Sequence, residues 1–447
     1  MQPPSERLPR TLGLGSATAI VIGITIGSGI FRSPAGVAQK VAEPTAFLSL
    51  WVVGGLLALA GALSLAELAA LFPESGGYYA YLRETWGRRT AFLFGWTQLV
   101  VLRASAIGGI ALACGQYSLR MLGIDPVEHA LQAQLTAAAA IVVASTANIF
   151  GARIGAAIVN LSSSAKFVAI VALGGAALLL GGGAEAATAA TANAAIPPVT
   201  IGSFGLALVS VLWAYDGFGD VSFAGGEVKD PQRTLPLAIV YGTLGVVVAY
   251  VLVNIGYLRV LSAPGIAASP LVAADTMTAL VGRAGTVMVS ALVALSTFGA
   301  LNADFLGSTR VFFAMAEDGL FFRAIARVHP RYKTPHVAIV LTAGLSLILV
   351  FSRSFEALTD TFVIAIWPFY ALCVAGLMRL RRLKPDLPRP YRVPGYPFVP
   401  LLFLVAAAGF LVNALVNDTI ATAATFAVIL AGLPVYQVVF ARRPAGR

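Results

Sequence analysis

The chain has 447 residues, of which 58% are hydrophobic and 11% are charged. This balance excludes a soluble globular domain, and the long continuous apolar runs exclude a β-barrel, whose strands would alternate. The sequence therefore predicts an all-α polytopic membrane protein. The net charge of +10 does not indicate a nucleic-acid partner, because the basic residues lie in loops between apolar segments.

Twelve apolar segments are long enough to form transmembrane helices, each of which needs about 20 apolar residues. The bilayer is thus the first expected partner. The expected spans are residues 12–40, 44–72, 87–119, 131–150, 155–181, 201–227, 234–260, 277–316, 336–352, 357–380, 397–416 and 419–441.

The basic residues are distributed unevenly between the two sets of loops. Loops on the cytoplasmic side carry an excess of Lys and Arg. The densest run follows the tenth span and contains Arg379, Arg381, Arg382, Lys384, Arg389 and Arg392. We therefore expect a multi-pass protein of the cell membrane with both termini in the cytoplasm.

The first span is interrupted at its centre by the stretch Thr25-Ile26-Gly27-Ser28-Gly29. Gly-Ser-Gly is a poor helix interior. In lipid, a broken helix is tolerated only where protein or a water-filled cavity covers the freed backbone groups. The freed N–H groups and the positive helix end favour an anion such as a carboxylate. This break therefore indicates a binding site.

The sixth span carries a second interruption, Trp213-Ala214-Tyr215-Asp216-Gly217, in which Asp216 is a carboxylate within the membrane. Gly27 and Gly217 are 190 positions apart, and each opens a group of five spans. Paired breaks at matching positions indicate an inverted-repeat transporter with its site between them. We expect a first repeat over residues 1–200, a second over 201–384, and two further helices with the tail over 385–447.

Six stretches resemble motifs of one known family. They follow the same order over nearly the whole chain, which makes chance agreement improbable. They are Gly27-Ser28-Gly29-Ile30-Phe31, Leu65-Ala66-Glu67-Leu68, Phe72 to Tyr81, Ala165-Lys166, Ser296 to Asn302 with Arg310-Val311-Phe312-Phe313, and Arg389 to Pro394. The chain resembles the amino acid–polyamine–organocation superfamily and, within it, bacterial members of the L-type amino acid transporter family.

The resemblance implies a LeuT-like fold of five plus five helices with helices 1 and 6 discontinuous, and sodium-independent transport of amino acids. Two unwound segments would line the substrate site. They contain Thr25, Ile26, Gly27, Ser28 and Gly29 on one side, and Trp213, Ala214, Asp216 and Gly217 on the other.

Individual roles follow from the same resemblance. Ser28 and Gly29 would donate backbone N–H groups to the substrate carboxylate. The carbonyls of Thr25 and Trp213 would accept from its ammonium group, and the Trp213 ring would be the gate. Asn302 would lie at the side-chain end of the pocket.

Two departures from the family pattern limit what carries over. Eukaryotic members have a cysteine after the third span, but residues 119–132 contain none, so no disulfide-linked heavy subunit is expected. Asp216 stands where many members have a small residue. It could bind the substrate ammonium, bind a proton or cap the next half-helix, so both neutral and cationic substrates stay open.

Lys166 lies about 16 Å into the fifth span, which is too deep for easy snorkelling. An ionisable residue at this depth is a functional hypothesis by default. We expect its ammonium to lie against the broken first helix, in place of a sodium ion. Glu67 is expected to have a scaffold role. Arg103 and Asp304 are also intramembrane and could form a buried pair.

These features predict a secondary transporter of small or neutral L-amino acids that works by alternating access, as an exchanger or with proton coupling. The alternative is a cationic amino acid or polyamine antiporter. No nucleotide-binding, esterase or zinc-protease motif is present. We therefore expect neither an enzyme nor a cofactor or metal, and no filter-like repeat suggests a channel.

Overall fold

The structure is a computed structural model that describes residues 10–73, 76–151, 162, 166, 169–181, 198–322, 324–325, 327–332 and 334–441. In these residues the regular structure is helical, with a single backbone bridge between Leu12 and Val228. Much of the predicted fifth span and most of the loop after it lie outside the described residues.

The first half of the chain contains α1 (Leu14–Thr25), α2 (Gly29–Lys40), α3 (Pro44–Leu71), α4 (Tyr78–Trp86), α5 (Arg88–Thr97), η2 (Gln98–Leu102), α6 (Arg103–Met121) and α7 (Ala130–Phe150). The second half contains α10 (Ile201–Ala214), η3 (Asp220–Glu227), α11 (Pro231–Ala268), α12 (Val272–Glu317), α13 (His336–Ser352) and α14 (Phe355–Leu383). The chain ends with α15 (Phe398–Asn417), α16 (Thr419–Leu430), α17 (Gly432–Val435) and η4 (Tyr436–Phe440).

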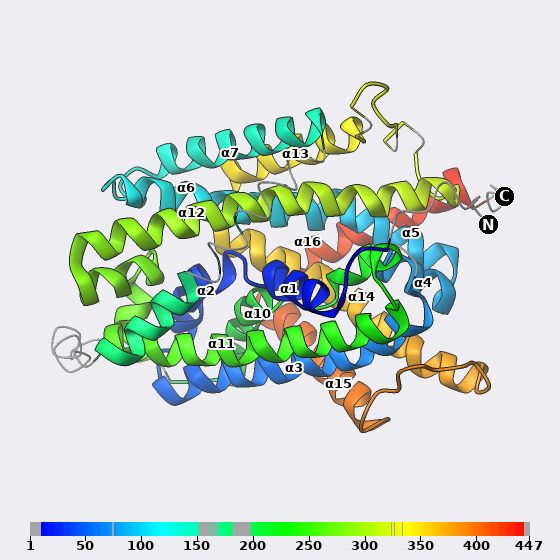
Figure 1. The fold of residues 1–447 in the computed structure, drawn as a ribbon, viewed down its shortest axis with the longest axis horizontal. Helices are drawn as coiled ribbons and strands as arrows, with labels where there is room; N and C mark the ends of the chain where they lie inside the picture. Colours follow the sequence, from blue (N-terminus) through cyan, green and yellow to red (C-terminus); the bar gives the residue numbers. More distant parts are fainter. Residues whose placement is uncertain are drawn as a thin grey trace.

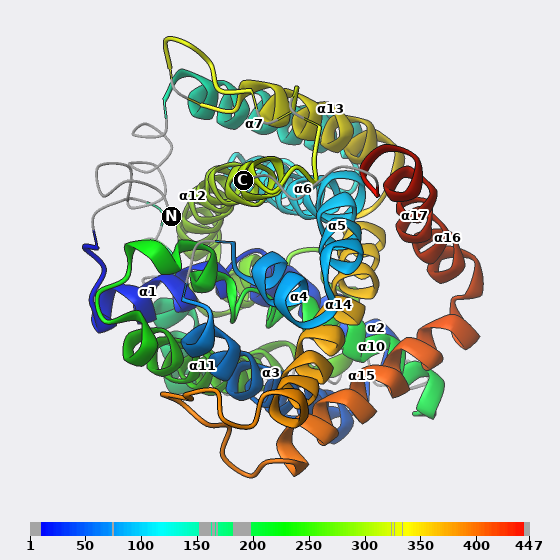
Figure 2. The same cartoon turned by 90° about the vertical axis from the view of Figure 1, so that its right-hand side faces the viewer.

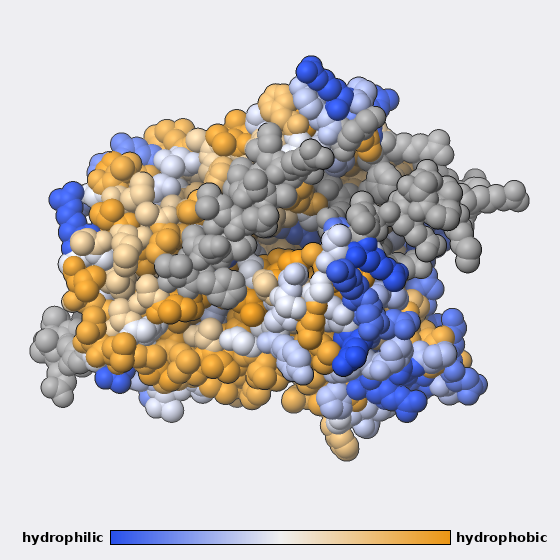
Figure 3. Space-filling view, viewed as in Figure 1, coloured by the Kyte–Doolittle hydropathy of each residue, from blue (hydrophilic) through white to orange (hydrophobic). Residues whose placement is uncertain are grey.

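Within the described residues, eight helical segments are long and apolar enough to cross a membrane, or nine if the bent pair α1–α2 counts as one span. Shorter apolar helices occur at Ala169–Leu180, α10 and α13. Large apolar side chains remain exposed on the outside, such as Ile420 at 87% and Val405 at 70%. Figure 3 shows apolar side chains spread across the middle of one face and polar ones gathered toward its ends. These features establish a multi-pass membrane protein.

The long helices α3, α11 and α12 run along the long axis (Figure 1). Viewed down that axis, α1, α3 and α11 lie on one side of the centre, and α5, α6 and α12 lie on the other (Figure 2). Helices α7 and α13 pack outside α6, while α15 and α16 pack against α14. The broken helices α1, α2 and α10 thus pack against a frame of continuous helices that includes α3, α11 and α14.

Glu67 joins three parts of this frame, as its predicted scaffold role requires. Its side chain is fully buried in α3. It accepts a 2.9 Å hydrogen bond from Nε of Arg381 in α14 and a 2.8 Å bond from the N–H of Val393. Nε of Arg389 lies 3.4 Å from the same carboxylate. A buried carboxylate needs such partners, because desolvating it alone is costly.

Candidate functional site

The first break lies where the sequence places it. Helix α1 ends at Thr25, α2 begins at Gly29, and the two are bent by 41°. Side chains from other elements donate hydrogen bonds to the freed carbonyls of α1. Nζ of Lys166 donates to the Gly23 carbonyl at 2.7 Å, and the Tyr250 hydroxyl donates to that of Thr25 at 2.9 Å. The structure therefore brings Lys166 directly against α1.

The N–H groups on the other side of this break are not paired in the same way. In the described part of the chain, no backbone carbonyl accepts from the N–H of Ser28 or Gly29. The Ser28 hydroxyl is also without a hydrogen-bond partner there, although the residue is only 1% exposed. These donors lie at the positive end of α2, where an anionic group is stabilised.

At the second break, backbone hydrogen bonds join residues three positions apart in the chain. Helix α10 ends at Ala214, and the N–H of Asp216 donates back to the Trp213 carbonyl at 3.2 Å. The N–H of Asp220 donates to the Gly217 carbonyl at 3.1 Å. Gly217 has φ of +97°, a conformation that side chains with Cβ rarely adopt. The glycine predicted to interrupt this span is therefore required by the turn.

The two breaks touch each other through their small residues. A Cβ atom added to Gly29 would lie 2.5 Å from Cα of Ala214. A Cβ added to Gly217 would lie 2.7 Å from Cγ2 of Ile24. Backbone can approach this closely only where no side chain intervenes. The unwound segments predicted to face each other are thus in direct contact.

A cavity of about 770 Å³ lies beside this contact. It extends from the breaks toward Leu12 and Glu227 at one end of the bundle. Eight of the predicted site residues line it. They are Thr25, Gly27, Ser28, Gly29, Lys166, Trp213, Asp216 and Gly217. Ile26 and Ala214 belong to the breaks but lie behind the cavity wall.

Asn302 also lies outside the cavity lining, and it belongs to neither break. It is fully buried in α12 and donates to the Phe298 carbonyl at 2.8 Å. Its Oδ1 accepts a 3.0 Å bond from Nδ2 of Asn148 in α7. Ala303 and Asp304, the next two residues, line the cavity instead. The Asn302 amide is thus used to join α12 to α7.

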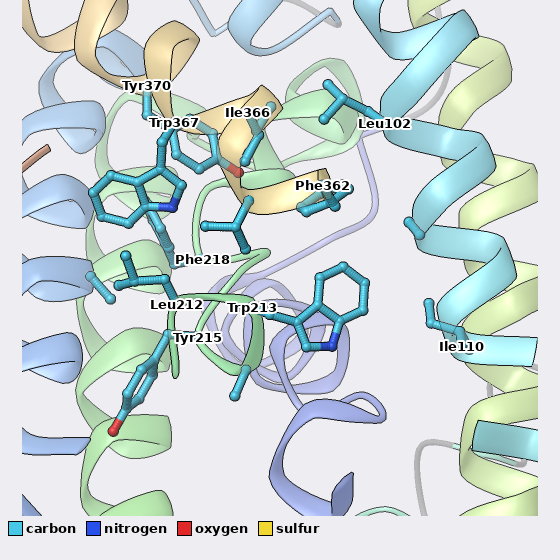
Figure 4. Close-up of a cluster of buried hydrophobic side chains, with 14 of the residues drawn as sticks. Leu102, Ile110, Leu212, Trp213, Tyr215, Phe218, Phe362, Ile366, Trp367 and Tyr370 are labelled. Atoms are coloured by element: carbon cyan, nitrogen blue, oxygen red, sulfur yellow. The ribbon is translucent and has the colours of Figure 1, made fainter. Parts of the chain in front are cut away.

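Aromatic side chains form one wall of the cavity. Trp213 is 9% exposed, and its ring contacts that of Phe362 edge-on, with centroids 5.0 Å apart. Figure 4 shows these two rings facing Ile110 of α6 across an open space. Phe362 was not predicted, because nothing in the apolar tenth span distinguishes a cavity-facing ring from a packed one.

Charged groups line the part of the cavity beyond the breaks. Arg103 and Asp304 form an ion pair between α6 and α12, and Nε of Arg103 also donates to Gln98 at 2.8 Å. The possible pair noted in the sequence is therefore formed. The hydroxyl of Tyr370 donates to Oδ1 of Asp216 at 2.8 Å. Nothing in the sequence pointed to Tyr370, since its partner lies 154 positions away.

On the side of the breaks away from Leu12 and Glu227, ion pairs and a hydrogen bond join α2 to neighbouring helices. Arg32 in α2 pairs with Glu356 in α14 at 2.8 Å, and Lys40 pairs with Asp360 at 3.6 Å. The Tyr117 hydroxyl donates to the Phe31 carbonyl at 2.7 Å. These contacts fix α2 against its neighbours. In the described residues, no three His, Cys, Asp or Glu side chains come together as a metal site.

Comparison with known proteins finds relatives over nearly the whole chain. A family described as amino acid permease matches residues 12–438. The chain is 32% identical over 439 residues to the serine/threonine exchanger SteT of Bacillus subtilis, covering 98% of each protein. It is 32% identical over 438 residues to the cystine/glutamate transporter of Homo sapiens, covering 97% of this chain and 87% of the relative. It is also 32% identical over 413 residues to the b(0,+)-type amino acid transporter 1 of Mus musculus, covering 92% and 84%.

Proposed function

The chain belongs to the amino acid permease family, within the amino acid–polyamine–organocation superfamily, and on this premise we propose that it transports small or neutral L-amino acids without sodium. The transport of amino acids follows from the family, whose relatives are transporters and not enzymes. The substrate class, the mechanism and the residue roles below are proposed.

The proposed layout has twelve spans, with repeats over residues 1–200 and 201–384 and two further helices over 385–447. The pairs α1–α2 and α10–η3 would be the first and sixth spans of this layout. Both termini would lie in the cytoplasm of a cell with the protein in its plasma membrane. The end of the cavity at Leu12 and Glu227 then faces the cytoplasm, which makes this an inward-facing state.

One observation carries the proposal. The two breaks contact each other, and the backbone N–H groups of Ser28 and Gly29 beside this contact donate to no backbone carbonyl of the described residues. The N–H groups of Ser28 and Gly29 would bind the substrate carboxylate. The carbonyls of Thr25 and Trp213 would accept from the ammonium group. The Thr25 carbonyl already accepts from the Tyr250 hydroxyl and from the Gly27 N–H, each at 2.9 Å, and the Trp213 carbonyl accepts from the Asp216 N–H at 3.2 Å. The ammonium group would therefore replace one of these donors when it binds, since a carbonyl oxygen has only two lone pairs.

The same geometry supports a mechanism of alternating access. A zwitterion bound across both breaks would contact α2 and α10 together, while Trp213 and Phe362 would cover its side chain. Substrate can shift a conformational equilibrium only through such differential contacts. Lys166 would hold the α1 carbonyls where other transporters use an ion. Cys114 and Cys373 are both buried, which fits the proposed lack of a disulfide-linked heavy subunit.

Counterflow in sodium-free proteoliposomes tests this function. Vesicles loaded with unlabelled L-serine should take up external radiolabelled L-serine, and neutral amino acids should compete better than lysine or arginine. Gly29→Ala should abolish uptake, because its Cβ would meet the Ala214 backbone at 2.5 Å. Gly15→Ala is the matched control, since a Cβ there meets nothing within 4 Å. Uptake that persists in Gly29→Ala would contradict the proposed site.

A second candidate function rests on Asp216, whose carboxylate lines the cavity beside the breaks. A cationic amino acid or polyamine antiporter would use it to bind an additional ammonium or guanidinium group. Asp216→Gly separates the two functions. Loss of lysine or arginine uptake with serine uptake retained would favour the cationic substrate.

A further inference from the structure

A second, smaller cavity lies on the side of the breaks away from Leu12 and Glu227. Its volume is about 150 Å³, and it is formed by α2, α6, the start of α7 and the start of α14. We call it the outer pocket, and the cavity beside the breaks the large cavity. The charged and amide side chains that line the outer pocket are Arg32, Gln116, Gln134, Arg353 and Glu356.

The outer pocket follows the large cavity along the same helices. On α2, Gly29 lines the large cavity and Arg32 lines the outer pocket. On α14, Phe362 lines the large cavity and Glu356 lines the outer pocket. At 1.5 Å per residue, these steps are about 4.5 Å and about 9 Å along the helix axes. A solute that enters the large cavity from this side therefore passes the outer pocket first.

An ion pair between Arg32 and Glu356 borders the outer pocket. The two side chains are 2.8 Å apart and are 12% and 32% exposed. Nε of Arg32 also donates to Oε1 of Gln116 at 3.3 Å, and its guanidinium lies over the Phe355 ring. This pair joins α2 to α14. Under the proposed alternating access, opening the large cavity on this side requires the pair to separate.

Arg353 brings a second guanidinium group to the outer pocket. Among the residues that the structure describes, its side chain forms no ion pair or hydrogen bond. The next carboxylate along α14, that of Asp360, is paired with Lys40. The outer pocket therefore contains two guanidinium groups and one carboxylate, and one of the guanidinium groups has no partner.

We propose that the outer pocket is a loading site, in which Arg353 and Arg32 bind the carboxylate of an amino acid and Glu356 binds its ammonium group. In the proposed layout this end faces the outside, so the external substrate would bind here before it reaches the breaks. This inference rests on the proposed function and adds an outer step to it. Arginine suits the task, because its planar guanidinium binds a carboxylate through two parallel hydrogen bonds.

The size of the outer pocket agrees with a small amino acid. A cavity of about 150 Å³ holds a molecule as large as benzene, and L-serine is of similar size. A larger amino acid would bind the same charged groups through its backbone part and extend its side chain out of the pocket. The loading site therefore recognises the carboxylate and ammonium groups that all amino acids share.

A zwitterion matches both partners of the ion pair. When Arg32 and Glu356 separate, each loses the group that compensates its charge, which is unfavourable away from bulk water. An amino acid supplies a carboxylate for Arg32 and an ammonium group for Glu356. A simple anion would replace only Glu356 and leave that carboxylate unpaired. The amino acid thus makes contacts in the separated state that are absent from the paired state, and such differential contacts shift a conformational equilibrium.

The first test compares the two sides of the membrane. Counterflow of radiolabelled L-serine is measured with the full chain in right-side-out and inside-out membrane vesicles, without sodium and at constant ionic strength. Arg353→Gln should raise the KM about fivefold in right-side-out vesicles, with the maximal rate within about twofold of wild type. In inside-out vesicles the KM should be unchanged. A KM increase that is absent, or no larger in right-side-out vesicles, would overturn the loading site.

Two control variants separate charge recognition from a general structural effect. Arg353→Lys keeps the positive charge and should recover at least about half of the KM change, with the remainder lost because lysine cannot bind a carboxylate bidentately. Arg283→Gln is the matched control. Arg283 is exposed beside Gly123 in the loop that precedes α7, and it lines neither cavity. It should keep the wild-type KM.

A labelling experiment measures occupancy of the outer pocket without transport. Ala130 is exposed and lines the pocket, whereas the native Cys114 and Cys373 are buried. In Ala130→Cys, saturating external L-serine should slow labelling by a membrane-impermeant thiol reagent at least about threefold. Adding Arg353→Gln should remove this protection. Equal protection by acetate or chloride at the same ionic strength would assign the pocket to simple anions and overturn the proposal.

The outcomes separate this inference from the proposed function. Intact counterflow with a wild-type KM and full serine protection in Arg353→Gln would overturn the loading site and leave amino acid transport standing. Absence of counterflow for every amino acid in the wild type would overturn the proposed function instead. The vesicle measurements do not use Ala130→Cys, so they decide the matter if that variant fails to fold.

Discussion

The two broken helices satisfy their freed backbone groups by different means. At the first break, side chains from other spans donate to the carbonyls of Gly23, Thr25 and Ile30. At the second break, the chain bonds to itself through short turns around Gly217. The first break has one local bond, from the Gly27 N–H to the Thr25 carbonyl at 2.9 Å, and is otherwise held by side chains of other helices. The second break is held mainly by its own turns.

The case of Ile30 shows why external donors are needed. The N–H of residue 34 would normally bond to this carbonyl, but residue 34 is proline and has no N–H. The Tyr257 hydroxyl of α11 donates to the Ile30 carbonyl at 3.2 Å. The first broken helix thus depends on distant residues at several points. Substitutions far away in sequence should damage it, whereas the second break should respond to changes within its own turn.

The largest effect should come from Lys166→Met, which removes the donor to Gly23 but keeps a long apolar side chain. Hydrogen bonds from charged groups contribute about 1.5–3 kcal/mol, so counterflow should fall about 10-fold to 150-fold. Lys384→Met, at an exposed position, is the matched control. Wild-type counterflow in Lys166→Met would show that the first break does not need this external donor.

Gly217→Ala should have the next largest effect, as a local change at the second break. Left-handed backbone costs a residue with Cβ about 1–2 kcal/mol, which lowers counterflow about 5-fold to 30-fold. The new Cβ would also meet Cγ2 of Ile24 at 2.7 Å. The further change Ile24→Ala should restore only the steric part. Gly344→Ala, where a Cβ meets nothing within 4 Å, should leave counterflow unchanged.

Tyr250→Phe removes only the hydroxyl that donates to Thr25 at 2.9 Å. The net loss for one neutral hydrogen bond is about 1 kcal/mol, or about fivefold in counterflow. Tyr241→Phe, on the same helix and 54% exposed, should be without effect. Equal counterflow in the two variants would mean that this break is not stabilised by α11.

Tyr257→Phe should have the smallest effect of the series, about twofold to threefold, because the bond to Ile30 is longer and lies one turn from the break. Its loss leaves a carbonyl that no N–H can reach, so the detergent melting temperature should also fall relative to Tyr241→Phe. A loss of counterflow larger than that of Tyr250→Phe would reverse the order expected from the distances.

The sequence predicted the positions of both breaks and one partner of the first, Lys166, but not the tyrosines that bind at them. Glycine and proline disrupt helices through local sterics, so Thr25 to Gly29 and Gly217 could be located from the local sequence alone. The donors Tyr250 and Tyr370 could not, because a membrane helix is apolar on all sides and does not reveal which face meets a neighbour. The surroundings of the Asn302 side chain could not be predicted for the same reason. It contacts Asn148 in this structure, and its role at the substrate stays a prediction.

The limits of the long spans were close where the apolar run ended in a polar loop, as at α15. They differed where a second helical segment follows the span directly. Helix α11 was expected to end at residue 260, and a further apolar segment reaches Ala268 beyond the non-helical residue Ser262, whose φ is +58°. Hydropathy predicts the limits of the membrane-spanning part of a chain. The hydrogen-bonded helical structure can extend beyond those limits.

The two ion pairs between α2 and α14 have a consequence for how the closed end opens. The side chains of Arg32 and Glu356 are 12% and 32% exposed, and those of Lys40 and Asp360 are 26% and 25% exposed. Pairs that water can reach contribute little, about 0–1 kcal/mol each, and dissolved salt weakens them over a Debye length of about 8 Å at 0.15 M. If the proposed alternating access holds, we therefore expect the ionic strength of the solution on that side to shift the balance between the two orientations, even where that solution contains no substrate.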